Sequence, residues 1–534
     1  MSIPVDLPHW LLAALPLAAV FLLLIGLHLL AYQAAAVSFL IACLISLLAF
    51  RADVPLLVME SGKGLWNAFT ILLVVWPAVF LYEISEQAGA FSALKQGLQK
   101  LTEHELLQVM ILGWLFPSFM QGITGFGVAV AVGAPLLMGI GVKPKWATVC
   151  VLLCHSWGGT FGTLAIAWQA LSDSIGLAGS DTALASLWAA GLIWIINLVG
   201  GVCLCWFYGK KQALKEGWPL ILLFSLIQGG GEVVMARLNP TLACFLPACL
   251  ALAAAFILSR TERYSRKWAL GASPMMERQT VARSTESNMN LKTALFPYLV
   301  LTGLTLVCLL IPQISQVLSR VKIGFAFPEM ETGYGFVTGA EASYSPFVPF
   351  QYAGSFLLVS DITTAVFFCR KGCMRARELA PVLKRTAKKA VPSSLAVIFF
   401  ILTSKAMGCS GQIIVLATGA ARVLGRYYAL LVPAIGLLGS FVTSSNMSSN
   451  IMFGVFQTTT AGMLGLDICA FAGAQTAGGA VGNAICPGNI VLGTTTTGKC
   501  VKEGEVLKTV VPIAIATALL IGLVLFILLT IPGE

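Results

Sequence analysis

The segment SFVTSSNMSSNIMFGVFQ, from Ser440 to Gln457, has the composition of a binding site inside a membrane. Six Ser and Asn residues lie between Ser444 and Asn450, and the flanking sequence is strongly apolar. A hydrocarbon interior offers no water to such groups, so polar, non-helical backbone persists there only where it lines a cavity or is buried in protein. Hydroxyl groups and carboxamides both donate and accept hydrogen bonds. They would suit a small hydroxy acid.

The composition of the whole chain predicts an all-α polytopic membrane protein around this segment. Hydrophobic residues make up 58% of the 534 residues and charged residues 10%, with a mean hydropathy of +0.88. A soluble domain has about a quarter charged residues, which this chain lacks. The net charge of +10 falls in loops between apolar runs, which fits the cytoplasmic bias of Lys and Arg. It does not indicate nucleic-acid binding.

Apolar windows of roughly 20 residues predict about 12 to 14 transmembrane helices. Three regions, residues 106–142, 428–463 and 469–498, are interrupted by Gly and polar residues and are predicted to be broken or re-entrant. A half-helix that begins inside the membrane has unpaired N–H groups, whose partial positive charge favours a carboxylate. The polar residues could alternatively serve only to cap helix ends. The candidates from the first break are Thr124, Gly125 and Gly127.

Charge divides the chain into two membrane halves. Residues 260–292 and 370–389 are strongly basic and are expected in the cytoplasm, whereas residues 315–349 have few basic residues and are expected outside. We therefore predict an N-terminal repeat at 1–258, a basic cytoplasmic linker at 259–292 and a C-terminal repeat at 293–534. The N-terminal repeat also has a Gly-rich element at 155–170.

Two motifs recur in the same order in both halves. SFMQGITGFG begins at Ser118 and GGTFGT follows 40 residues later; SFVTSSNMSS begins at Ser440 and GGAVGN follows 38 residues later. Chance is the alternative, since the chain has 52 Gly. The loop after the first Gly-rich motif has no Lys or Arg, but the one after the second contains Lys499, Lys502 and Lys508. This difference in charge places the two equivalent loops on opposite sides of the membrane. It predicts inverted-topology repeats whose broken helices meet near the midplane of the bilayer.

Ionisable residues within apolar runs are candidates for ion coupling. His155 precedes the first Gly-rich motif and could carry a proton, or it could be a neutral ring hydrogen-bonded between helices. Lys405 could offset a substrate's charge or extend from a helix end to the interface. Asp361 could carry a proton, bind a cation or pair with Lys405. Glu83 and Glu232 lie nearer the ends of predicted spans.

Four ordered motifs resemble segments of the bacterial L-lactate permease family: TGFGVAVAVGAPLL from Thr124, HSWGGTFG from His155, SNMSSNIMFGVFQ from Ser445 and GGAVGNAICPGNI from Gly478. The resemblance implies a bacterial inner-membrane carrier that moves lactate, glycolate or related 2-hydroxy monocarboxylates with protons. It maps the family's polar signature onto Ser445, Asn446, Met447, Ser448, Ser449 and Asn450, followed by Gln457. Met447 replaces a hydroxyl residue there, and Asn483 stands where some members have Lys.

We therefore expect a proton-coupled secondary transporter that works by alternating access. The alternatives are a divergent, sodium-coupled carrier of another small organic anion, an anion channel and an intramembrane enzyme. The sequence has no P-loop and no zinc-type spacing among its 14 Cys, so we expect no enzyme activity, cofactor or metal. The predicted substrate-binding residues are Thr124, Gly125, Gly127, Ser445, Asn446, Ser448, Ser449, Asn450, Gln457 and Asn483.

Overall fold

The computed structural model describes residues 3–27, 29–99, 101–125, 127–277, 289–497 and 501–530. Phe126, Lys499 and part of the basic linker lie outside them. In the described chain, ten helices are long and apolar enough to cross a membrane, or up to twelve if each of two bent pairs is one span. The prediction of an all-α polytopic membrane protein is confirmed. The upper count of twelve spans equals the lower end of the expected range of about 12 to 14.

The helices of the first half run from α1 to α13. They are α1 (Leu7–Phe21), α2 (Ala31–Leu48), α3 (Val54–Gln87), α4 (Ala90–Gln99), α5 (Glu105–Met110), α6 (Phe116–Ile123), α7 (Val128–Met138), α8 (Pro144–His155), α9 (Gly162–Ile175), α10 (Ser180–Ser225), α11 (Gly231–Leu238), α12 (Phe245–Leu258) and α13 (Glu262–Ser265). Short 3₁₀ or π segments join several of them: η1 (Leu22–Gly26), η2 (Ile111–Leu115), η3 (Ser156–Gly159), η4 (Leu226–Gly230) and η5 (Pro240–Leu242).

The second half contains the remaining helices and all the strands. Its helices are α14 (Leu291–Ala294), α15 (Phe296–Leu310), α16 (Pro312–Leu318), α17 (Ala353–Arg370), α18 (Leu379–Ser410), α19 (Gln412–Leu424), α20 (Val432–Thr443), α21 (Asn446–Leu464), α22 (Ile468–Gly482), α23 (Pro487–Thr496) and α24 (Glu503–Thr530). Its short helices are η6 (Pro349–Gln351), η7 (Ala376–Glu378) and η8 (Gly425–Leu430), and its strands are β1 (Ile323–Phe327), β2 (Met330–Glu331), β3 (Val337–Thr338) and β4 (Glu341–Phe347).

Apolar side chains on the outside of the fold are consistent with a lipid environment. On α2, the side chains of Leu40, Leu44 and Leu48 recur every four residues and are 60%, 56% and 82% exposed. A four-residue repeat places them on one face of the helix. An apolar stripe of this kind is unfavourable in water, so this face of α2 lies against lipid.

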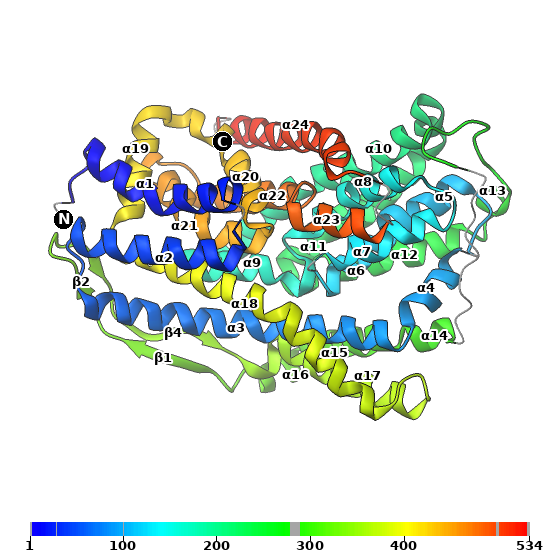
Figure 1. Ribbon diagram of the computed structural model, residues 1–534, viewed down its shortest axis with the longest axis horizontal. Coiled ribbons are helices and arrows are strands. Elements are labelled where there is room, and N and C mark those ends of the chain that lie inside the picture. Colours follow the sequence, from blue (N-terminus) through cyan, green and yellow to red (C-terminus); the bar gives the residue numbers. More distant parts are fainter. Residues whose placement is uncertain are drawn as a thin grey trace.

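The helices form two packed groups. We call α2, α3 and α18 the wall, because α18 packs along both of the others and the three lie side by side in Figure 1. We call α6 to α9 and α20 to α23 the bundle, in which α20, α21 and α22 pack on one another and α9 packs on α21. Helices α6 to α9 come from the first half of the chain and α20 to α23 from the second, so the bundle unites segments from both halves. In the wall, Arg385 of α18 forms a 2.8 Å ion pair with Glu83 of α3.

One part of the fold agrees with the helix pattern of the sequence and another adds to it. Residues 184–208 and 218–235 have the pattern of separate spans, and α10 is broken between them, at Gly209 and Lys210, which have non-helical backbone angles. Within residues 315–349, β1 pairs with β4 and β2 pairs with β3, both antiparallel. The strands lie at the same end of the molecule as the N-terminus (Figure 1). Cross-strand pairing depends on contacts distant in sequence.

Candidate intramembrane site

The first helix break separates α6 from α7. Gly125 and Gly127 have φ values of 55° and 76°, in the left-handed region that glycine adopts without a Cβ penalty. Gly127 is also the residue before α7, and no side chain caps that helix. The N-terminus of α7 therefore opens onto the space beside it with its amides free of a side-chain cap.

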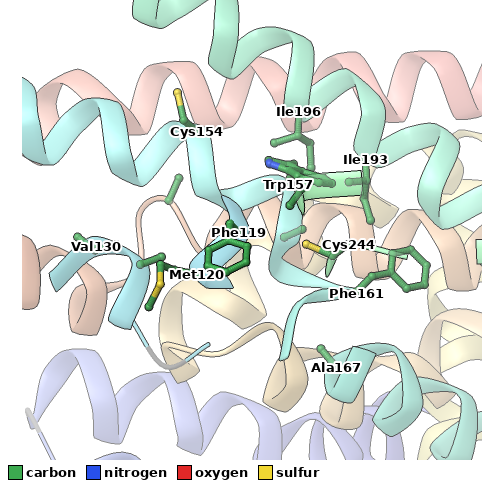
Figure 2. Close-up of a cluster of buried hydrophobic side chains, with 14 of the residues drawn as sticks. Phe119, Met120, Val130, Cys154, Trp157, Phe161, Ala167, Ile193, Ile196 and Cys244 are labelled. Carbon is green, nitrogen blue, oxygen red and sulfur yellow. The ribbon is translucent and has the colours of Figure 1, made fainter. Parts of the chain in front are cut away.

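The second break lies between α8 and α9, whose axes differ by 50°. Thr163, Leu164 and Ala165 have φ values of 50°, 53° and 64°. A left-handed conformation costs a non-glycine residue roughly 1–2 kcal/mol, so the surrounding packing must hold this turn. Figure 2 shows part of that packing, where Trp157 and Phe161 lie with Phe119 in an apolar cluster. Strain held in this way is often found at functional sites.

Two further breaks lie in the C-terminal half. Ser444 has a φ of 56° between α20 and α21, and the side chain of Ser445 accepts a hydrogen bond from the Ser448 amide at 3.3 Å, which caps α21. Helix α22 ends at Gly482, and α23 begins at Pro487 after a four-residue turn. Pro is suited to a first helical turn because it has no N–H to leave unpaired. The predicted broken elements are thus broken in the structure.

All four breaks meet at one cavity. Its volume is about 350 Å³ and it lies between the bundle and residues of α2, α18 and the segment before α2. Four helices begin at it. Gly127 and Ser445 are the N-caps of α7 and α21, Gly162 is the first residue of α9, and Asn489 is the third residue of α23. The lining residues are Leu30, Ala31, Tyr32, Gln121, Gly125, Gly127, His155, Gly159, Gly162, Thr163, Ile166, Ala167, Pro392, Ser393, Ala396, Val397, Thr443, Ser444, Ser445, Asn446, Met447, Ser448, Asn483 and Asn489.

The cavity is polar without a fixed charge. Among the described residues that line it there is no Lys, Arg, Asp or Glu, while hydroxyls, carboxamides and helix N-termini are plentiful. Each helix N-terminus has a partial positive charge of about half an elementary charge. Backbone amides in a first turn that opens onto the cavity, as that of α7 does, can bind an anion even though no cationic side chain is present.

Asn446 joins the breaks of the two halves. Its Nδ2 donates to the carbonyl oxygens of Gly159 at 3.1 Å and Thr476 at 3.2 Å, and to the hydroxyl of Thr160 at 3.1 Å. The hydroxyls of Thr160 and Thr476 are 2.9 Å apart. The carboxamide therefore holds the turn before α9 against α22.

Asn450, one turn further along α21, makes a second bridge. Its Nδ2 donates to the carbonyl of Ala167 at 2.9 Å and to the hydroxyl of Thr476 at 2.8 Å. The Oδ1 atoms of Asn446 and Asn450 are buried, and neither has a hydrogen-bond partner in the described chain. Buried acceptors without a partner usually mark water, a ligand or a functional role.

The structure separates the other predicted residues into two sets. Asn483 lies in the cavity with Gly125, Gly127, Ser445, Asn446 and Ser448. Thr124, Ser449, Asn450 and Gln457 lie outside the lining: Thr124 bonds to the carbonyl of Met120, Ser449 to that of Gly436, and Gln457 accepts from the hydroxyl of Tyr428. This second set stabilises the helices that form the cavity wall.

His155 lies in the cavity lining. Its ring is 1% exposed, and Nδ1 lies 2.8 Å from the carbonyl oxygen of Val151 in the same helix. Since a carbonyl only accepts, we assign the proton to Nδ1, which leaves Nε2 as the acceptor of the neutral ring. The bond to Val151 lies within α8 and does not link two helices.

Asp361 and Lys405 do not line this cavity. Lys405 lines a second cavity of about 270 Å³ with Glu60, Ser174, Thr338 and residues of α18 and α21, and its Nζ lies 4.9 Å from the centre of the Tyr344 ring. The carboxylate of Asp361 is buried in α17 without a hydrogen-bond partner among the described residues. Among the residues that the structure describes, Lys405 and Asp361 form no ion pair with each other.

Sequence reasoning missed several residues of the first cavity. Asn489 follows Pro487 in a motif that was noted, and its Nδ2 donates to the carbonyl of Asn483 at 3.0 Å. Tyr32 and Ser393 come from the wall, far from any motif. Thr160 and Thr476 lie outside the cavity lining, and their roles depend on a contact between the halves. Asn489, a polar residue at the start of a half-helix, and Thr160, within the GGTFGT motif, each had a local signal.

A polytopic helical protein whose discontinuous helices enclose a polar cavity belongs, as a class, to the membrane transport proteins. The sequence model of the family described as L-lactate permease matches residues 9–532. The chain belongs to that family, and it is a multi-pass protein of the bacterial inner membrane.

Named relatives are similar over nearly their full length. The L-lactate permease of Halalkalibacterium halodurans is 25% identical over 511 residues, covering 93% of this chain and 92% of that one. The L-lactate permease and the glycolate permease GlcA of Escherichia coli K12 are 26% and 23% identical over 542 residues, each covering 96% of this chain and 94% of the relative. Among solved structures, the YdaH transporter of Alcanivorax borkumensis matches with a TM-score of 0.44 at 15% identity, over 87% of this chain and 86% of that one.

Proposed function

We propose that this protein imports L-lactate, or a related small 2-hydroxy monocarboxylate such as glycolate or D-lactate, together with protons by alternating access. The observation that carries the proposal is the meeting of four helix breaks at one polar cavity whose described lining has no Lys, Arg, Asp or Glu. The names of the relatives support the same substrate class. A secondary carrier of this kind is not an enzyme, and its cargo is unchanged on release.

The cavity offers suitable partners to each part of a 2-hydroxy acid. Backbone amides in the first turns of α7 and α21 would hold the carboxylate. Ser448, Asn483 and Asn489 lie on the same cavity and would hydrogen-bond the hydroxyl. Met447, Ile166 and Val397 would contact the methyl group of lactate. An uncharged site also releases a monoanion more readily than a fixed ion pair would.

The two cavities suggest an access route. Helices α9, α18 and α21 line both: Ile166, Val397 and Met447 border the first, and Ser174, Ile401 and Ile451 border the second further along the same helices. The second cavity also includes Val337 and Thr338 of β3, in the segment expected outside. Movement of the bundle against the wall would then connect the first cavity to one side at a time.

Lys405 should assist capture of the anion on this route. Glu60 lines the same cavity, but it forms a 2.9 Å ion pair with Lys63, whereas the described residues contain no ion pair of Lys405. Lys405→Gln should raise KM about threefold to tenfold and leave kcat nearly unchanged, because a charge on an access path acts mainly on association. Initial uptake rates at low and high ionic strength measure this.

Charge-preserving and distant variants provide the controls for this prediction. Lys405→Arg should retain most of the wild-type KM. Lys145 lines neither cavity, although its Nζ also lies over an aromatic ring, 5.3 Å from that of Trp146, so Lys145→Gln should change little. A collapse of kcat in both Lys405 variants with KM unchanged would place Lys405 in the transport step instead.

Reconstitution into liposomes tests the proposed function itself. Labelled L-lactate should accumulate when the lumen is alkaline relative to the bath, and an imposed sodium gradient should add nothing. The alternative is a divergent carrier, which the resemblance suggests because Asn483 stands where some family members have Lys. Sodium-driven uptake of another small organic anion would establish that alternative. Failure of every hydroxy acid under every gradient would refute the proposal.

A further inference from the structure

Glu232 lies behind the cavity in an unusual environment. It belongs to α11 within a candidate span, its side chain is 0% exposed, and neither carboxyl oxygen has a hydrogen-bond partner in the described chain. Removing an ionised carboxylate from water without a partner costs many kcal/mol. In this conformation the neutral, protonated carboxyl is the form that the surroundings tolerate.

A second set of buried polar groups lies close to Glu232 along the chain. Gln228, four residues earlier in η4, accepts through Oε1 from Nδ2 of Asn197 at 2.9 Å. Asn197 Oδ1 and Gln228 Nε2 are buried without partners among the described residues. Fully apolar side chains would pack this region at lower cost, so these buried polar groups need a functional explanation.

The backbone beside Glu232 is suited to local rearrangement. The π segment η4 leads directly into α11, and Gly229, Gly230 and Gly231 are consecutive. Such π segments insert an extra residue into a helix and occur often at functional sites. Figure 1 places α11 near the middle of the molecule's long axis.

Cys244 connects the surroundings of Glu232 with the cavity wall. It is the N-cap of α12, which packs on η4 and α11, and its thiol interacts electrostatically with Glu232. A Cβ added to Gly158 would lie 3.0 Å from the Cys244 sulfur, and Figure 2 shows Cys244 beside Trp157 and Phe161. Gly159, the next residue, lines the cavity. Glu232 is thus one layer of residues from the candidate site.

We propose that Glu232 carries the coupling proton. The inference rests on the proposed proton-coupled transport. A proton from the outer side binds the carboxylate, the neutral carboxyl crosses with the lactate-loaded conformation, and the proton leaves to the inner side after the substrate. One proton with one monoanion makes the cycle electroneutral. His155, on the cavity surface, is then free to contact the substrate.

The isosteric Glu232→Gln variant in liposomes tests this role. It should lose accumulation driven by an inside-alkaline gradient by about tenfold or more, yet retain exchange of internal for labelled external lactate within about twofold, because exchange needs no proton release. Glu232→Asp should retain part of the accumulation. Intact accumulation in Glu232→Gln, or loss of exchange in both variants while they remain folded, would overturn the proposal.

Two comparisons make the test specific. Asp361→Asn removes another buried carboxyl without a described partner and should leave accumulation intact; an uncoupled phenotype there and not in Glu232→Gln would reassign the proton. If a sodium gradient drives the wild type and Glu232→Gln abolishes that, the carboxylate binds sodium and the proton assignment fails.

A spectroscopic measurement separates this inference from the transport proposal. Infrared spectra of the purified protein near neutral pH should contain a protonated-carboxyl C=O band that Glu232→Gln lacks. Absence of that difference would overturn the assignment to Glu232 even if lactate transport is proven. Its presence, with no transport of any hydroxy acid, would refute the proposed function alone.

Discussion

Asn446→Ala should reduce lactate uptake about a hundredfold while the protein still inserts in the membrane. The substitution removes the donor to the carbonyls of Gly159 and Thr476. Each buried acceptor left without a partner costs about 1–3 kcal/mol, and 1.4 kcal/mol is a factor of ten. The turn before α9 would separate from α22, and the cavity would lose the geometry that directs the helix N-termini. Initial uptake rates in reconstituted vesicles, normalised to inserted protein, measure the loss.

A matched control lies on the same helix. Among the described residues, Thr458 of α21 bonds only to carbonyls of its own helix, those of Gly454 and Val455, and it does not line the cavity. Thr458→Ala should therefore transport at nearly the wild-type rate. Full transport by the Asn446→Ala/Asn450→Ala double variant would mean that the substrate binds elsewhere in the chain.

The helix breaks could be predicted because their cause is local. Left-handed turns favour Gly, which identifies Gly125 and Gly127, and a helix that begins within apolar sequence needs a capping hydroxyl such as Ser445. Polar residues of this kind are costly in a membrane unless they line a cavity. The motif repeated in both halves then indicated that the two sets of breaks belong to one structure. The inverted relation of the halves and their boundaries stay predictions.

The orientation of individual side chains could not be predicted in the same way. Ser448 lines the cavity and Ser449, the next residue, bonds to Gly436, because successive residues of a helix face directions about 100° apart. Which face points inward depends on neighbours such as α22. The contact of Thr160 with Thr476 spans 316 residues; Thr160 lies in the repeated GGTFGT motif, but nothing in the sequence identifies Thr476 as its partner. Glu232 was recognised as ionisable, but its burial without a partner depends on α10 and α12.

Gly479→Ala should impair transport by displacing Asn446 and not by removing it. A Cβ at Gly479 would overlap Oδ1 of Asn446 and lie 2.8 Å from its Cγ. Overpacking of this kind costs about 1–3 kcal/mol, and the displaced carboxamide would lose its bonds to Thr160 and Thr476. We expect a lower thermal unfolding temperature in detergent. We also expect an uptake rate reduced about tenfold or more, because about 1.4 kcal/mol corresponds to a factor of ten.

A double-mutant cycle on thermal stability identifies that mechanism. In the Asn446→Ala background the overlapping carboxamide is absent, so Gly479→Ala should cost little further stability, a clear departure from additivity. Gly303 of α15 is the comparison, because a Cβ there meets nothing within 4 Å; Gly303→Ala should be neutral or stabilise the helix by up to about 1 kcal/mol. Additive losses from Gly479→Ala and Asn446→Ala would show that the alanine methyl group disturbs some contact other than Asn446. In that case the close approach of α21 to α22 would not be what positions the bridging carboxamide.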